Sequence, residues 1–186
     1  MPFLKSLPQT AHLADLFRRF PDNVEPLMRY TDGVLRAPGS LSVAEREMIA
    51  TYTSGLNACT FCHASHKVYA ALFGFDADLM DAMLEDFDKA PIDAKMRPLL
   101  DYVRKLNDLP SRLTEADAQA VYDAGWDEKA LFEAVQVNGL FNMMNRIVEG
   151  CGINFDYSDD PARHPAHNST PEAHANSYAR FGRQFT

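Results

Sequence analysis

Helix start and stop signals punctuate most of this chain, and they constrain its fold more than any other feature. Ser42 and Glu45 form a capping box, and Asp127 precedes the longest segment with helical apolar spacing. Apolar residues also recur at helical spacing over residues 92–108. No run of alternating polar and apolar residues lies between hairpin turns. The sequence therefore predicts an all-α fold, a multi-helix bundle of about eight helices.

Caps, glycines and prolines set the expected ends of these helices. The expected ranges are two helices within 10–36, then about 42–54, 59–73, 76–90, 92–108, 114–125 and 128–150. Thr10 and Asp22 are the natural N-caps for the first two helices, and Gly55 is the expected stop of the third. Helices joined by such short loops usually pack as antiparallel neighbours.

The composition changes near the end of the chain. Residues 1–156 are predicted to form the helical domain, and residues 157–186 a C-terminal arm rich in histidine and proline. Tyr178, Phe181 and Phe185 are spaced i, i+3 and i+7, which places three aromatic rings on one face. This spacing predicts that the arm docks on something, such as a neighbouring subunit, and a partly disordered tail is the alternative. The arm's histidines form no recognisable metal site.

Charge and hydropathy exclude several classes of partner. The 186 residues carry a formal net charge of −8, which repels nucleic acid phosphates and anionic lipid. The longest apolar stretch, Leu131–Cys151, is interrupted by charged and amide side chains, so no membrane span is expected. The first residues lack an apolar signal core. These features predict a cytoplasmic protein.

The segment from Cys59 to His66 carries the candidate chemistry. Two of the three cysteines form a C-x-x-C, which in a reducing compartment indicates redox or metal chemistry. Cys59 is expected at a helix N-terminus with Cys62 one turn later, so both sulfurs would share one face within disulfide reach. A helix N-terminus lowers a thiol pKa. His66 is four residues after Cys62, where an imidazole can accept the thiol proton.

Two other readings of this segment stay open. His63 has the same spacing from Cys59 as His66 has from Cys62, so a Cys₂His₂ zinc site is one alternative. Four ligands on one rigid helix face do not converge tetrahedrally, and Cys151 stands alone, so we expect no metal and no cofactor. The second alternative is structural, with buried free cysteines and incidental histidines.

Three asparagines interrupt the apolar surface of the last long helix. Asn138, Asn142 and Asn145 are spaced i, i+4 and i+7. Buried amides need hydrogen-bond partners. We therefore expect this stripe to form a core hydrogen-bond network or a subunit contact, rather than to carry chemistry.

The spacing of four residues resembles a known family. Glu47 lies twelve positions before Cys59, and with Cys62 and His66 it matches the Glu…Cys-x-x-Cys-x-x-x-His pattern of the AhpD-like alkylhydroperoxidases. These proteins belong to the carboxymuconolactone decarboxylase superfamily, and the chain is most similar to its peroxidase-related branch. Residues 40–75 carry most of the resemblance. It implies an all-α AhpD-like bundle, commonly assembled as trimers or hexamers, that acts without a cofactor.

The resemblance also implies roles for these four residues. Cys62 would be the peroxidatic thiol and Cys59 the resolving thiol. His66 would deprotonate Cys62, and Glu47 would orient His66 or relay protons to it. The best-known members carry a histidine directly before the second cysteine, where this chain has Phe61. Dithiol chemistry does not depend on that histidine.

The function expected from these residues is a thiol oxidoreductase of the antioxidant, peroxiredoxin type. It would reduce alkyl hydroperoxides with the C-x-x-C pair and be recycled by an external dithiol protein. The alternatives are a disulfide reductase or redox relay without peroxidase activity, and a non-catalytic helical assembly member of the superfamily. The resemblance and the amount of apolar helix surface predict a homo-oligomer. The paired thiols argue against decarboxylase chemistry, which does not need them.

Overall fold

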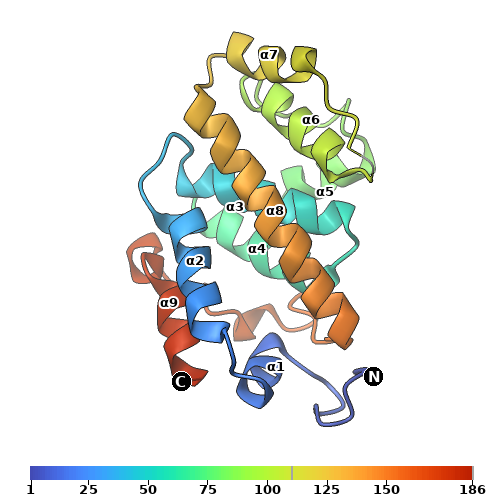
Figure 1. Ribbon diagram of the computed structural model, residues 1–186, viewed down its shortest axis with the longest axis vertical. Helices are drawn as coiled ribbons and strands as arrows, with labels where there is room; N and C mark the ends of the chain where they lie inside the picture. Colours follow the sequence, from blue (N-terminus) through green and yellow to red (C-terminus); the bar gives the residue numbers. More distant parts are fainter. Residues whose placement is uncertain (110, 186) are drawn as a thin grey trace.

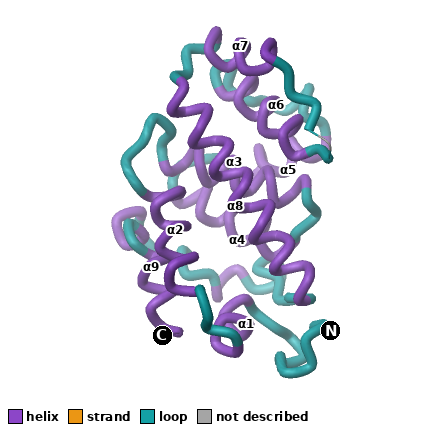
Figure 2. The backbone as a smooth tube through the Cα atoms, viewed as in Figure 1, coloured by secondary structure: helices purple, strands orange, loops and turns teal. Residues whose placement is uncertain are grey.

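The computed structural model describes residues 1–109 and 111–185, so Pro110 and Thr186, the last residue of the predicted arm, lie outside the described residues. Helices joined by loops, with no β-strand, make up this part of the chain (Figures 1 and 2). The all-α prediction is confirmed. The α-helices are α1 (Leu13–Arg19), α2 (Val24–Arg36), α3 (Val43–Leu56), α4 (Thr60–Leu72), α5 (Ala77–Glu85), α6 (Met96–Asn107), α7 (Glu115–Asp123), α8 (Glu128–Cys151) and α9 (Ser177–Gly182).

Helices α3 and α4 pack closely against each other and form the centre of the molecule, and α3 also packs against α8. In Figure 1, α8 crosses the length of the bundle, with α6 and α7 at one end and α1 at the other. The core is apolar and tightly closed, and Leu35, Ile49, Leu99 and Val137 have no exposed surface. No helix in the described part is both long enough and apolar enough to cross a membrane.

The structure corrects the predicted N-caps of the first two helices. His12 caps α1, because its Nδ1 accepts the backbone N–H of Ala14 at 2.9 Å. Asn23 precedes α2 in the left-handed conformation, with φ 64°, and makes no side-chain cap. The predicted N-caps Thr10 and Asp22 were therefore wrong. At α1 the reason is that an imidazole nitrogen accepts a helix N–H as well as a hydroxyl oxygen does. The capping box of Ser42 and Glu45 at the start of α3 is confirmed.

The asparagine stripe of α8 is a core hydrogen-bond network, as predicted. Asn57, which follows α3, donates to Asn145 Oδ1 at 2.9 Å. Asn107, at the end of α6, donates to Asn57 Oδ1 at 2.9 Å and accepts from Asn142 at 2.7 Å. Asn138 also donates to Asn107 Oδ1, at 3.1 Å. Amides from three elements thus satisfy one another, and they fix the end of α3 just before Cys59.

Residues 157–185 lie along the bundle as short helical turns and loops. They hold three 3₁₀ turns, η1 (Pro161–Arg163), η2 (Pro171–His174) and η3 (Arg183–Phe185), in addition to α9. Helix α9 packs beside α2, and Asp32 of α2 accepts the backbone N–H of Ala179 at 2.6 Å (Figure 1). The rings of Phe181 and Phe185 meet Phe17 at 6.1 and 5.9 Å. The arm thus contacts its own chain, and its docking on a neighbouring subunit stays a prediction.

Candidate active site

The turn between α3 and α4 places the C-x-x-C. The predicted stop at Gly55 was wrong, because α3 continues through Leu56. The chain reverses at Ala58, which adopts a left-handed φ of 53°. The Cys59 N–H then donates to Ser54 O at 2.9 Å, and Cys59 O accepts the first bond of α4 from His63. Cys59 is therefore the N-cap of α4, and Cys62 lies in its first turn.

The two thiols differ in access. Cys62 lines a cavity of about 450 Å³, whereas Cys59 does not line it and has no exposed surface. Both thiols are free. The Cys62 thiol beside it, together with burial, raises the pKa of Cys59. A small molecule in the cavity therefore meets Cys62 first, with Cys59 shielded next to it.

His66 belongs to a buried chain of charged and polar groups from three helices. Its Nδ1 is 2.6 Å from Glu47 Oε2, and Glu47 Oε1 is 2.5 Å from Arg36 Nη1. Burial opposes ionisation of Glu47, but Arg36 and then His66 outweigh it and lower the pKa of that carboxyl. An ionised Glu47 accepts the Nδ1 proton of His66. In the neutral ring this hydrogen bond leaves the lone pair on Nε2, where a general base requires it.

Aromatic rings enclose this chain of groups. The Arg36 guanidinium lies 5.2 Å from the ring centre of Tyr69 and 5.1 Å from that of Tyr178. The His66 ring meets Phe141 edge-on at 4.4 Å. Sequence reasoning missed Arg36, because nothing in its local pattern marks it as the partner of Glu47. The enclosure removes water from around the charges and so strengthens their interaction.

His63 faces away from the cavity. Its Nδ1 donates to the carbonyl of Thr51 at 3.0 Å, and its Nε2 lies 3.7 Å from Asp81. Over residues 1–109 and 111–185, no group of three or more His, Cys, Asp or Glu side chains is placed to hold a metal ion.

The arm supplies the wall of the cavity that faces α4. Tyr157, His164, His174 and Tyr178 all line it. His164 Nδ1 accepts the Ala166 N–H at 3.1 Å, so the ring proton is on Nε2, which donates to Ser65 Oγ at 2.9 Å. Burial lowers the pKa of His164 to about 3. This histidine is a neutral, fixed part of the wall.

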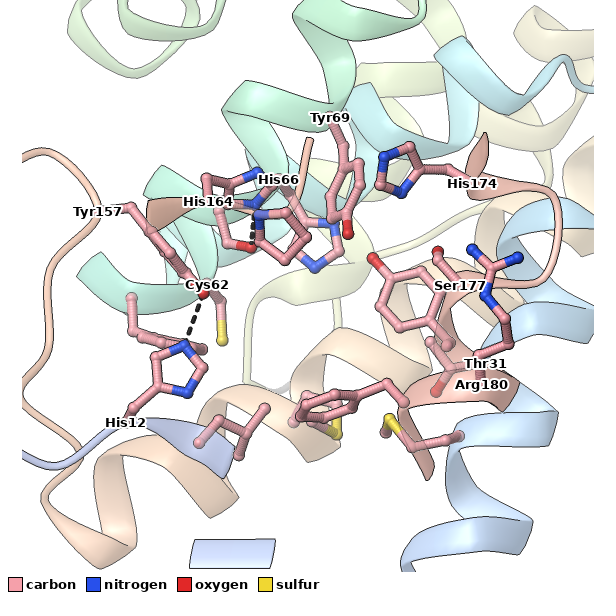
Figure 3. A pocket seen from close by; sticks show the side chains of 18 of the residues that line it. His12, Thr31, Cys62, His66, Tyr69, Tyr157, His164, His174, Ser177 and Arg180 are labelled. Carbon is pink, nitrogen blue, oxygen red and sulfur yellow. Dashed lines mark hydrogen bonds between the residues drawn. The ribbon is translucent and has the colours of Figure 1, made fainter. Parts of the chain in front are cut away.

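His12 and Tyr157 lie next to Cys62 (Figure 3). Because His12 Nδ1 accepts the Ala14 N–H, the ring proton is on Nε2, which donates to Tyr157 Oη at 2.6 Å. Burial lowers the pKa of His12. Phe61, the residue directly before Cys62, packs against the His12 ring, with the ring centres 5.1 Å apart. The hydroxyl hydrogen of Tyr157 is not used by His12 and is free for a molecule in the cavity.

The structure therefore brings together the four residues singled out in the sequence. Cys62 and His66 share the cavity, Glu47 lies behind His66, and Cys59 lies beside Cys62. Local sequence patterns missed the rest of the lining. The aromatic spacing in the arm was a partial signal for this lining, because it indicated that the segment packs on another surface.

Comparisons with known proteins agree with this fold. The sequence profile described as the carboxymuconolactone decarboxylase family matches residues 21–97, from α2 into the start of α6. A comparison with curated protein sequences gives no match.

Solved structures give the wider similarity. One is an alkylhydroperoxidase AhpD core described as an uncharacterized peroxidase-related protein from Ralstonia eutropha JMP134. It is 25% identical, with a TM-score of 0.69 over 74% of this chain and 73% of that one. An uncharacterized peroxidase-related protein from Silicibacter sp. TM1040 is 24% identical, with a TM-score of 0.69 over 75% and 73%. A protein of unknown function from Agrobacterium tumefaciens is 16% identical, with a TM-score of 0.65 over 74% and 92%. The chain thus has the fold of these AhpD-like and peroxidase-related structures, and residues 21–97 resemble the carboxymuconolactone decarboxylase family.

Proposed function

We propose that this chain reduces organic hydroperoxides with the Cys62 thiol, needs no bound cofactor, and is recycled by an external dithiol protein. One observation carries the proposal. Cys62 and His66 open on the same cavity, while Cys59 lies beside Cys62 and outside the lining. This is the arrangement that a reacting thiol, its base and a resolving thiol require.

The first step oxidises Cys62. His66 Nε2 accepts the Cys62 proton, with Glu47 holding the imidazole through Nδ1. The thiolate attacks the terminal oxygen of ROOH, the O–O bond breaks, and Cys62 becomes a sulfenic acid. The leaving alkoxide takes the proton that His66 accepted from Cys62 and departs as the alcohol ROH, so His66 is again neutral and ready for the next turnover. The Tyr157 hydroxyl, oriented by His12, is placed to donate a hydrogen bond to that leaving oxygen.

The second step forms the disulfide. Cys59 loses its proton and attacks the Cys62 sulfur, and the sulfenic hydroxyl departs with that proton as water. Because the pKa of Cys59 is raised, this thiol stays protonated and unreactive until the sulfenic acid forms beside it. The external dithiol then reduces the pair by thiol–disulfide exchange and becomes a disulfide itself.

The cavity favours peroxide reduction over the alternative of a disulfide reductase. Cys62 is only 4% exposed and lies in the wall of a cavity of about 450 Å³, where a small hydroperoxide fits and a folded protein disulfide does not. If the chain had only a non-catalytic assembly role, the ionised Glu47 between Arg36 and His66 would have no function. Buried charges of this kind are costly to maintain.

A single turnover of the reduced protein tests the proposal. We expect one equivalent of cumene hydroperoxide to give a Cys59–Cys62 disulfide by mass spectrometry. Cys59→Ser is expected to stop at a sulfenic acid on Cys62, which dimedone traps, and Cys62→Ser to consume no peroxide. Cys151→Ser is the matched control and should behave as wild type. Free thiols after prolonged exposure of wild type to peroxide would refute the proposal.

We also propose that the chain works as a cytoplasmic homo-oligomer, a trimer or hexamer. Helix α8 leaves Phe132 and Met143 exposed, at 59% and 41%, and apolar side chains of this size are common in subunit contacts. Sedimentation at micromolar concentration tests this, and a monomer there would count against it.

A further inference from the structure

The cavity has two ends that differ in chemistry. In Figure 3, Cys62 and Tyr157 lie on one side, whereas His174, Ser177 and Arg180 lie on the other. The second side, called the arm side below, is formed by residues 174–180 and is not used in the proposed reaction at Cys62.

The arm side holds buried polar atoms that no protein group satisfies. His174 Nε2 bonds Ser169 Oγ at 3.0 Å, but His174 Nδ1 is buried with no hydrogen-bond partner in the described part of the chain. Tyr178 Oη is also buried and unpartnered there, and both residues line the cavity. Buried polar groups nearly always have partners, so a ligand or an ordered water in the cavity would complete the hydrogen bonds of these two atoms.

The charged side chain among the described lining residues is a cation, and the carboxylate behind Tyr178, Glu47, is paired with Arg36. Arg180 lines the cavity on this side, its guanidinium held by a hydrogen bond to the Ala173 carbonyl. No Asp or Glu is among the described residues that line the cavity. A carboxylate would select the tautomer in which His174 Nδ1 carries the proton and Nε2 accepts from Ser169, and Tyr178 offers an O–H. Two donors and one cation match the oxygens of a carboxylate.

Much of the cavity lining is apolar. Its apolar side chains include Leu13, Met28, Phe141, Met144 and Phe181. A cavity of about 450 Å³ holds a small organic molecule, and its apolar surface excludes a fully polar one.

We infer that the arm end of the cavity is a carboxylate-binding subsite. The ligand is an amphipathic organic acid whose apolar body lies between Met28 and Phe141. Its carboxylate meets Tyr178, His174 and Arg180, and its far end reaches Cys62. That this ligand is the substrate, an organic hydroperoxide bearing a carboxylate remote from the O–O bond, rests on the proposed function. The binding itself does not.

Binding of unreactive product alcohols isolates the subsite from the thiol chemistry. The matched probes are 2-phenyl-2-propanol and 4-(2-hydroxypropan-2-yl)benzoate, which differ only in the carboxylate. Calorimetric titration of the reduced protein is expected to show at least about tenfold tighter binding of the benzoate. Raising the salt concentration should reduce that difference, because Arg180 is exposed to solvent.

Two variants locate the effect. Tyr178→Phe and Arg180→Gln are each expected to weaken benzoate binding about fivefold or more, and to leave binding of the neutral alcohol within about twofold. Tyr122→Phe on α7, far from the cavity, is the matched control and should change neither. Circular dichroism checks that each variant is folded. If Tyr178→Phe does not fold, Arg180→Gln, at an exposed position, still tests the subsite.

The outcomes separate the two proposals. Equal affinity for the two probes, or the same loss in Tyr122→Phe as in Tyr178→Phe, overturns the carboxylate subsite. Selective benzoate binding with no peroxide consumption supports the subsite and rejects the peroxidase function. Peroxide consumption without a preference for the benzoate supports the peroxidase function and rejects the subsite.

Discussion

The two walls of the cavity are built in different ways. The α4 wall holds Cys62 and His66 on consecutive turns of one helix, so a short stretch of sequence fixes their relative positions. The arm wall gathers Tyr157, His164 and Tyr178 from loops and short helical turns, which contacts with other elements hold in place. The residues of the proposed reaction are thus encoded locally, and those of the proposed ligand selection are encoded at long range.

Two histidines show what the difference means. His66 meets an ionised carboxylate, Glu47, which orients its ring and leaves Nε2 towards the cavity side as the proton acceptor of the proposed reaction. His164 meets only a hydroxyl and a backbone N–H, and burial lowers its pKa to about 3. The partner, rather than the residue type, decides which histidine can act as a base.

The largest expected effect is on stability, from a change behind the α4 wall. Glu47→Gln leaves the Arg36 guanidinium buried without its counter-charge, which should cost about 3–5 kcal/mol in the free energy of unfolding. Urea unfolding measures this. Glu128→Gln, an exposed change on α8, is the control and should cost less than about 0.5 kcal/mol. A loss below about 1 kcal/mol for Glu47→Gln would show that the pair is not a buried charge pair.

The second effect is on rate. His66→Gln removes the base but keeps a polar side chain, and should slow Cys62 oxidation about 100-fold, which corresponds to about 2.7 kcal/mol. Stopped-flow kinetics with cumene hydroperoxide at pH 7 measures it. His63→Gln is the matched control on the same helix, since His63 faces away from the cavity. Equal slowing in both variants would mean that His66 has no special role.

The third effect is a loss of stability in acid that originates in the arm wall. His164 has a pKa of about 3 in the fold and an ordinary value of 6.5 in the unfolded chain. Its contribution to stability is therefore complete above about pH 6.5 and is lost as the pH falls towards 3. By pH 5 the loss should be about 2 kcal/mol.

His164→Asn should remove this loss, because an amide oxygen can still accept the Ala166 N–H and does not titrate. Unfolding by denaturant at pH 7 and pH 5 measures both proteins. Parallel changes in wild type and variant would assign the acid sensitivity to other groups, such as His12.

The smallest expected effect is a local loss of stability in the arm, with the stability of α4 unchanged. Asp32 accepts the backbone N–H groups of Tyr178 and Ala179. Asp32→Ala should cost about 1 kcal/mol and speed amide exchange in residues 177–182, while exchange in α4 stays unchanged. Hydrogen exchange with mass spectrometry checks both segments. Faster exchange in α4 as well would mean that the two walls unfold together.

Most of the fold could be predicted from sequence, because its signals are local. The capping box at Ser42 and the apolar spacing within α6 predicted helices that the structure confirms. The errors were also local. Gly55 lies inside α3, since Ala58 takes the left-handed turn instead, and His12 caps α1 in place of the expected threonine.

The site could be predicted only in part, for a physical reason. Cys59, Cys62 and His66 lie within two helical turns, so their spacing alone predicts that they meet. Arg36 and Tyr178 reach the site through the packing of α2 and α9, which no short pattern records. The aromatic spacing of the arm indicated that it packs on some surface, but not that it closes the cavity.

The most direct test of the account is the reactivity of the two thiols in the native, reduced protein. Iodoacetamide labelling at pH 7, followed by peptide mass spectrometry over time, measures both rates in one sample. We predict that Cys62, which lines the cavity, reacts at least about 100-fold faster than buried Cys59. We also predict that 2-phenyl-2-propanol slows only the Cys62 reaction. Equal rates, or faster labelling of Cys59, would contradict the assignment of Cys62 as the thiol that meets the peroxide.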